Sequence, residues 1–406
     1  MTGRRASSRP ATVVRIGLLA ALFALASAGS EAAALQSQFS VTDSAGIRIT
    51  TSDAADRDAG AVCSLAEAAD TRVASPASGE WTLYGIEDLD RMEDGRLVLV
   101  NRGSRELLMF GRDGKFLRSV GGSGEGPGEF MDPIELDFVA GDSIVAWDWR
   151  SGRLELFGPD GSPGRSVRLD PPVPNPAGYV GVIGGEGIAI ASHDVRQFDT
   201  QLVPQFLQIL RYDWGGRLLD TLATLPYGEL GLLAPGSRRM SRPAFESRGV
   251  FSTHGDLLYT SDGASPEVRV HRGERLERIV RWDPGDLSVR ADDGTAYSDA
   301  RLEGVADDLA PAIRRSLNAF PPKDTFPAVT EIRIDPRGRL WIRTFARPGS
   351  TANEWLGFAE TGAFICSLSV PRAFAVFHFD SAAVVGVHKD EMDVESLEVR
   401  SFTVPR

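Results

Sequence analysis

The sequence predicts an all-β fold made of repeated small antiparallel sheets, and three observations support this. First, residues 96–114 align without a gap with residues 143–161, at an offset of 47 residues. Second, each of these segments holds two apolar strands and then an Asp-Gly pair, which is a hairpin-turn signal. Third, similar units recur roughly every 45–60 residues to the end of the chain.

Six such units can be aligned, and most contain four short strands. An apolar or aromatic residue near the end of one strand serves as the reference point, or anchor, for aligning the units. The last unit starts at Phe374. The anchors of the first five units are Phe110, Phe157, Tyr212, Val270 and Phe358. Repeated four-stranded sheets of this length are typical of a β-propeller, so we predict six blades.

The last unit has only three strands before the chain ends. The segment Ala45–Thr50 alternates like a strand and has no evident local partner. We predict that it completes the sixth blade, because an open ring would leave unpaired strand edges. The alternative is an N-terminal arm without regular structure.

An insertion is predicted between the fourth and fifth blades. The anchors Val270 and Phe358 are 88 residues apart, and apolar residues within positions ~284–322 recur at steps of three or four, which is typical of helices. Pro311 should break or kink this helical segment. It would form either a lid over the central channel or a surface decoration.

The N-terminus has the features of a secretory signal peptide. A basic segment without acids precedes the apolar run Ile16–Leu25, and small residues follow. We predict a signal peptide over residues 1–34, cleaved after Ala28 or Ala34, and a propeller domain over residues 40–406. The protein would then be exported to the periplasm or the cell exterior and would not be integral to the membrane. The alternative is an uncleaved anchor.

Composition excludes several classes of protein. The chain has 406 residues, 42% of them hydrophobic, and a formal net charge of −12. The apolar fraction is too high for a disordered chain, and the acidic balance argues against a nucleic-acid partner. Cys63 and Cys366 are the only cysteines. Export would permit a disulfide between them, and two unpaired buried thiols are the alternative.

One stretch resembles a known group of proteins. It reads Gly124-Glu125-Gly126-Pro127-Gly128-Glu129-Phe130 and resembles a motif of exported bacterial six-bladed β-propellers related to NHL-repeat proteins. Residues 334–342 and 386–395 resemble the same group. The group has no established general activity, so the resemblance implies a fold and no particular function.

The motif can also be interpreted from its residues. Three glycines allow unusual backbone angles, and the proline stiffens the turn between two blades. Glu129 would either accept backbone N–H bonds within this loop or face a ligand.

Channel-lining strands provide candidate ligand-binding residues. The 47-residue offset places Asp88 and Glu135 at one equivalent position, and the fifth blade adds Glu331 there; Asp90 and Asp137 share the next position. Innermost strands line the channel of a propeller, so the carboxylates could bind Ca²⁺ or a cationic ligand. The alternative is a solvated channel wall.

No catalytic motif is recognisable in the sequence. The five histidines lack the spacing of a helix-borne zinc site, and we expect surface or packing roles for them. They are His193, His254, His271, His378 and His388. We therefore predict a monomeric, non-catalytic binding or scaffold module for a peptide, glycan or protein, with no cofactor. The alternative function is a Ca²⁺-dependent hydrolase or lyase that uses the channel carboxylates.

Overall fold

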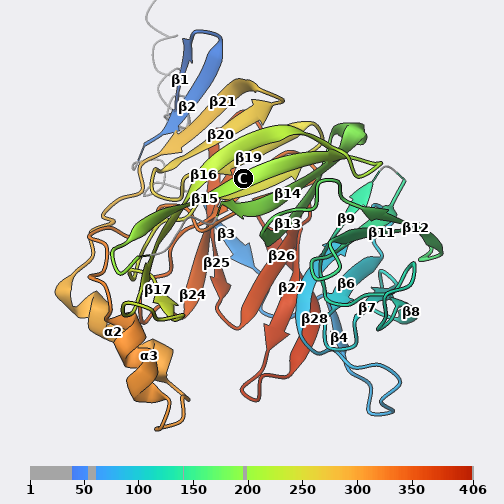
Figure 1. Cartoon of the computed structure of the whole chain (residues 1–406). Helices are drawn as coiled ribbons and strands as arrows, with labels where there is room; N and C mark the ends of the chain where they lie inside the picture. The colour runs from blue at the N-terminus through green and yellow to red at the C-terminus, as the bar shows by residue number, and fades with distance from the viewer. Residues whose placement is uncertain (1–38, 54–60, 140, 195–198, 405–406) are drawn as a thin grey trace, which may run out of the picture. The chain divides into compact units, whose positions relative to one another are not determined.

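Strands dominate the computed structural model of the chain (Figure 1), which describes residues 39–53, 61–139, 141–194 and 199–404. The predicted signal peptide lies outside these residues. Six antiparallel units of strands follow one another along the chain. We number them as blades 1 to 6.

The first three blades occupy residues 86–241. Blade 1 comprises β5 (Ile86–Arg91), β6 (Leu97–Asn101), β7 (Glu106–Phe110) and β8 (Phe116–Gly121). Blade 2 comprises β9 (Pro133–Val139), β10 (Ser143–Asp148), β11 (Arg153–Phe157) and β12 (Pro163–Arg168). Blade 3 comprises β13 (Pro176–Ile183), the short 3-10 helix η1 (Gly184–Glu186), β14 (Gly187–Asp194), β15 (Val203–Asp213), β16 (Leu218–Leu232) and the short edge strand β17 (Met240–Ser241).

The other three blades each recruit one or two strands from the N-terminal region. Blade 4 comprises β18 (Val250–His254), β19 (Leu257–Ser261), β20 (Glu267–Arg272) and β21 (Arg275–Trp282), extended by β2 (Ile47–Ser52) and β1 (Phe39–Ser44). Blade 5 comprises β22 (Glu331–Ile334), β23 (Leu340–Arg343), β24 (Ala352–Phe358) and β25 (Phe364–Pro371), extended by β3 (Val62–Leu65). Blade 6 comprises β26 (Phe374–Phe379), β27 (Ala383–Lys389) and β28 (Glu395–Thr403), completed by β4 (Thr71–Ala74).

The six blades close into a ring. The first strand of each blade contacts the first strand of the next, and β26 of blade 6 contacts β5 of blade 1. Six clusters of buried apolar side chains each join two neighbouring blades. The fold is therefore the six-bladed β-propeller that the repeats predict, with these first strands innermost.

Strand β6 shows how the sequence produces this packing. Every residue of β6 is buried. Leu97 and Leu99 pack in the cluster shared with blade 6, whereas Val98 and Val100 pack in the cluster shared with blade 2. Successive side chains of a strand point to opposite faces, so a strand between two blades has to be apolar at nearly every position.

The strand that closes blade 6 is not the predicted one. Ile47–Ser52 forms a hairpin with β1 and runs parallel to β21 at the outer edge of blade 4. At the hairpin turn, Ala45 and Gly46 both have positive φ angles of 54° and 80°. The prediction for Ala45–Thr50 was therefore wrong on two points, because this segment has a local partner and adds to another blade. Thr71–Ala74 pairs with β28 instead.

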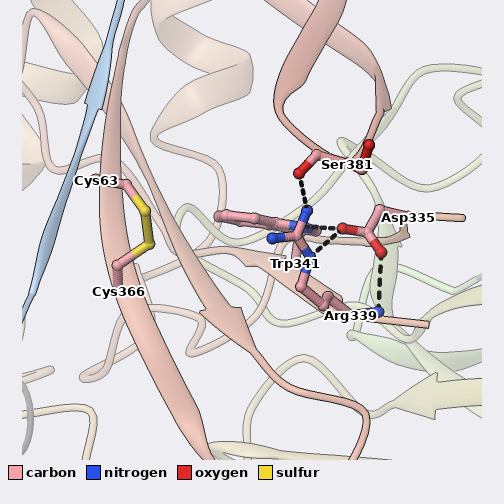
Figure 2. Close-up of a disulfide and its surroundings, with 6 residues drawn as sticks. All are labelled: Cys63, Asp335, Arg339, Trp341, Cys366 and Ser381. Atoms are coloured by element: carbon pink, nitrogen blue, oxygen red, sulfur yellow. Dashed lines mark hydrogen bonds and ion pairs between the residues drawn. A yellow bond between two sulfur atoms is a disulfide. The ribbon is translucent and has the colours of Figure 1, made fainter. Parts of the chain in front are cut away.

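A disulfide joins Cys63 of β3 to Cys366 of β25 (Figure 2), with 5.6 Å between the two Cα atoms. Strand β3 pairs with β25 on one side and with the end of β28 on the other, so it links blades 5 and 6. Trp341 lies in the same buried cluster and stacks on Phe379 of blade 6 at 4.5 Å between ring centroids. The disulfide thus fastens β3 covalently to blade 5, and strand pairing of β3 together with aromatic packing holds blade 5 to blade 6.

A buried turn also holds blade 5 to blade 6. Asp335 is fully buried and accepts bonds from the guanidinium of Arg339 at 2.5 Å and from the indole of Trp341 at 3.3 Å (Figure 2). Arg339 donates in turn to the carbonyl oxygen of Ser381 in blade 6 at 2.5 Å. Burial of a charged pair is tolerated here because each charge has several hydrogen-bond partners.

Two helices form the insertion between blades 4 and 5, as predicted. They are α2 (Ala291–Leu302) and α3 (Ala310–Leu317), orange in Figure 1. Pro311 lies in the first turn of α3, where its missing N–H costs no hydrogen bond, so it starts a helix. Within the described residues, no helix has both the length and the apolar character to cross a lipid bilayer.

Candidate functional site: an acidic axial cavity

The innermost strands surround a cavity of about 200 Å³, which we call the axial cavity. Residues of β5, β9, β13, β18, β22 and β26 line it, so every blade contributes. Five carboxyl groups and two cationic side chains face it. They are Glu87, Asp88, Asp90, Glu135, Asp137, Arg333 and His378. The cavity is therefore acidic in balance.

Asp88 links the innermost strands of blades 1 and 2. Its carboxylate accepts a hydrogen bond of 2.9 Å from the backbone N–H of Leu136 and another of 2.9 Å from that of Leu89. Burial disfavours the charged form and raises the pKa of Asp88 to about 6, although these N–H groups and Arg333 act in the opposite direction. Asp88 therefore combines a structural contact with an unusual affinity for a proton.

Asp137 repeats this arrangement one blade further on. It accepts bonds from the backbone N–H groups of Val182 in blade 3, at 2.6 Å, and of Phe138, at 2.7 Å. Burial, together with the nearby charge of Asp90, raises the pKa of Asp137 to about 7. A cation that entered the cavity would meet a carboxyl group that is only partly ionised at neutral pH.

Asp90 pairs with His378 across the ring. The distance from Asp90 Oδ1 to His378 Nδ1 is 2.5 Å. Burial by itself would lower the pKa of His378, but the charge of Asp90 and the hydrogen bond to it raise the pKa above the usual value. The pair therefore joins blades 1 and 6, and it becomes an ion pair when His378 is protonated.

Arg333 is the second cation of the cavity. It pairs with Glu331 at 2.8 Å, and Glu331 also pairs with Arg343 at 3.0 Å. Burial would lower the pKa of Arg333, but Glu331 and Asp88 hold it above the usual value. Glu331 is thus engaged by two guanidinium groups and does not line the axial cavity, whereas Asp88 and Glu135 do. Glu331, Asp88 and Glu135 all act on the charge of Arg333, and the convergence of these three carboxylates on a ligand stays a prediction.

The strand registers show that charged or titratable residues occupy one equivalent position on the innermost strands of four blades. Asp90 pairs with Val98, Asp137 with Val145, Arg333 with Trp341 and His378 with Val385, and these positions are equivalent in their blades. His378 was missed because the register of β26 shifts between Val376 and His378. A β-bulge of this kind moves one residue onto the other face, and a repeat alignment cannot show it.

The residues of the glycine-rich motif do not line the axial cavity. Glu129 accepts a bond of 2.9 Å from the backbone N–H of Gly126, inside the loop. Gly128 has a φ of +77° and donates its N–H to the buried Glu155 of blade 2 at 2.9 Å. Phe130 is fully buried between blades 1 and 2. Glu129 was expected either to accept backbone N–H bonds within the loop or to face a ligand. Its contact with Gly126 corresponds to the first of these roles.

A calcium site would need several converging oxygen ligands. Among the residues that the structure describes, no group of three or more His, Cys, Asp and Glu side chains is arranged to hold a metal ion. Arg333 also places a positive charge beside Asp88.

The fold and its axial cavity define the chain as a six-bladed β-propeller. Residues 80–153 match the model of the family DUF5128, which is described as a 6-bladed beta-propeller. The matched residues include the motif Gly124–Phe130, so the resemblance to six-bladed propellers noted in the sequence is confirmed. No curated protein matches the chain.

Several solved structures are similar at low identity. A protein from Bacteroides fragilis with an inferred exported location has 9% identity and a TM-score of 0.49, covering 88% of this chain and all of its own. A DUF4221 family member from Bacteroides vulgatus has 10% identity and a TM-score of 0.46, covering 84% and 99%. An inactive virginiamycin B lyase from Staphylococcus aureus, bound to quinupristin, has 9% identity and a TM-score of 0.39, covering 84% and 95%.

Proposed function

We propose that the protein is an exported binding module whose axial cavity accepts a primary ammonium group, such as a lysine side chain of a peptide or protein. The acidic lining of the axial cavity carries this proposal: five carboxyl groups face it, against two cationic side chains. A volume of about 200 Å³ accommodates an ammonium group with a short alkyl stem. The signal-peptide pattern at the N-terminus supports export.

The partner of the ammonium group would be the carboxyl groups that are not already neutralised. Asp90 is paired with His378 and Glu87 with Arg102, the latter at 2.8 Å. Asp88 and Asp137 carry raised pKa values because burial leaves their charges poorly compensated. A bound cation would supply that compensation, and charge-assisted hydrogen bonds are among the stronger polar contacts in proteins.

We expect diaminobutane to bind the wild-type protein at pH 8 and to bind at least about tenfold more weakly at pH 5. The reason is that Asp137 and Asp88 are ionised at pH 8 but protonated at pH 5, given pKa values of about 7 and about 6. The amine stays charged over this range. Isothermal titration calorimetry measures both affinities, and butanediol, which is uncharged, should not bind.

Two variants and a second probe complete this test. Asp137→Asn should weaken diaminobutane binding at pH 8 by about tenfold, a typical cost for losing a charged hydrogen-bond partner. Asp113→Asn removes the same charge from an exposed turn and should change nothing. Equal affinity of the two variants, or no binding to the wild type, would refute the proposal. Tighter binding of Ca²⁺ than of the diamine would favour the alternative function as a calcium-dependent enzyme.

A further inference from the structure

A second cavity, of about 410 Å³, lies where helix α2 of the insertion meets blades 3, 4 and 5. We call it the insertion pocket. The helix contributes Tyr297 and Arg301, which are four residues apart and therefore on one face of α2. Blade 3 contributes Tyr227, and the residues just after β23 contribute Phe345. The insertion thus completes a pocket that the blades alone would leave open.

Aromatic rings form one wall of the insertion pocket. Phe245 is buried and contacts Tyr297 at 5.1 Å and Phe345 at 5.8 Å between ring centroids, edge to face in both cases. Its φ of 62° lies in the left-handed region, which is costly for a bulky residue and is found mostly where the surroundings enforce it. Tyr227, Tyr297 and Phe345 are only partly buried and present ring surface to the pocket. Such a wall favours a planar apolar group.

Guanidinium groups surround the same cavity. Arg248, Arg301 and Arg343 line it, and all three remain partly exposed. The guanidinium of Arg301 lies 5.4 Å from the ring centre of Tyr297, which brings the positive charge beside the aromatic wall. Guanidinium groups recognise carboxylates through paired, planar hydrogen bonds.

One acid, Glu246, lines the insertion pocket, and its contacts fix it in place. Its carboxylate pairs with Arg242 at 3.0 Å and with Arg248 at 2.9 Å, and it accepts the backbone N–H of Glu229 at 2.8 Å. Only 4% of its side chain is exposed. Glu246 therefore positions Arg248 at the pocket. Arg343 is held in the same way by Glu331 at 3.0 Å, and the lining itself has three guanidinium groups and one carboxylate.

From this combination we infer that the insertion pocket binds a small aromatic carboxylate. The ring would lie against Tyr227, Tyr297 and Phe345, and the carboxylate would face the guanidinium groups of Arg248 and Arg301. This site differs from the axial cavity in its lining residues and in the sign of the ligand's charge. It also assigns a role to the helical insertion, which the sequence left open between a lid and a decoration.

The test uses the full chain and three probes: naphthoate, uncharged naphthylmethanol and non-aromatic cyclohexanecarboxylate. We expect calorimetry to show naphthoate binding to the wild type at least about tenfold more tightly than either of the other two. Arg301→Gln should weaken naphthoate binding by about tenfold, and so should Tyr297→Leu. Arg315→Gln removes the same charge from an exposed residue of α3, outside the pocket, and should leave the affinity unchanged.

Each other outcome contradicts part of the inference. If naphthylmethanol bound as tightly as naphthoate, the pocket would not select for a carboxylate. If cyclohexanecarboxylate bound as tightly as naphthoate, the pocket would not select for an aromatic ring. No naphthoate binding, or equal effects of Arg301→Gln and Arg315→Gln, would overturn the site. Thermal unfolding of each variant confirms that it is folded. Diaminobutane binding should be the same in Arg301→Gln as in the wild type, so failure of this inference is distinguishable from failure of the proposed function.

Discussion

Reducing the disulfide is expected to lower the free energy of unfolding by about 5 kcal/mol, the largest effect we predict. Cys63 and Cys366 are 303 residues apart in the sequence. A cross-link over such a long loop removes much of the conformational freedom of the unfolded chain, and the entropic gain increases with the logarithm of loop length. The cross-link also fixes β3, which joins the edges of blades 5 and 6.

Urea denaturation of the oxidised and reduced wild type measures this effect without changing the packing volume at either cysteine. The double variant Cys63→Ala, Cys366→Ala should lose slightly more, because both residues are buried and each substitution leaves a small cavity. In that variant, addition of a reductant should have no further effect. A difference below about 1 kcal/mol between oxidised and reduced protein would show that strand pairing alone closes the ring.

The fold itself could be predicted from local sequence patterns. The 47-residue offset and the Asp-Gly turns mark successive blades in the sequence, and the uninterrupted apolar run of a strand such as β6 marks a strand buried between two blades. The insertion was predictable for the same reason, because helical spacing differs from strand spacing. These signals are local, so they can be recognised in the sequence without knowledge of the tertiary structure.

Ring closure depends on a contact that is remote in sequence. The prediction that a strand near the N-terminus completes blade 6 is confirmed, but that strand is Thr71–Ala74 and not Ala45–Thr50. Ile47–Ser52 alternates more clearly than Thr71–Ala74, which is four residues long and buries only Val73. Yet Thr71–Ala74 lies closer in sequence to blade 1. Blade 6 packs against blade 1, so this segment is near the outer edge of blade 6. Which strand pairs across the closed ring depends on where the ring places each segment in space. The apolar and polar pattern of the strand itself says little about that position.

The axial cavity was predictable in part. Aligned repeats placed Asp88, Asp90, Glu135 and Asp137 on innermost strands, and the structure brings all four to one cavity. The pairing of Asp90 with His378 was not predictable, because it requires both the closed ring and the register shift in β26. The engagement of Glu331 by two arginines was equally hidden, since Arg343 lies on the adjacent strand.

Asp137→Asn is expected to remove a large pH dependence of stability. The pKa of Asp137 is raised to about 7 in the folded protein, so the folded state holds a proton that the unfolded state has released. Stability therefore falls as pH rises from the unfolded value near 4 to the folded value near 7, and it is level above that. Between pH 5 and pH 8, the cost of ionising Asp137 should grow by at most about 3 kcal/mol, two pKa units at about 1.4 kcal/mol each.

The asparagine variant stays uncharged and can still accept the N–H of Val182 that Asp137 bonds at 2.6 Å. Its stability relative to the wild type should therefore increase between pH 5 and pH 8, and urea denaturation at the two values measures the change. The pKa of Asp113 is lowered by its hydrogen bonds with Lys115, so Asp113 is ionised in both the folded and unfolded states throughout this range. Asp113→Asn should accordingly show no such trend. If the stabilities of the two variants change with pH in the same way, the raised pKa of Asp137 does not cause the pH dependence. The proposal that the axial cavity holds uncompensated negative charge would then be contradicted.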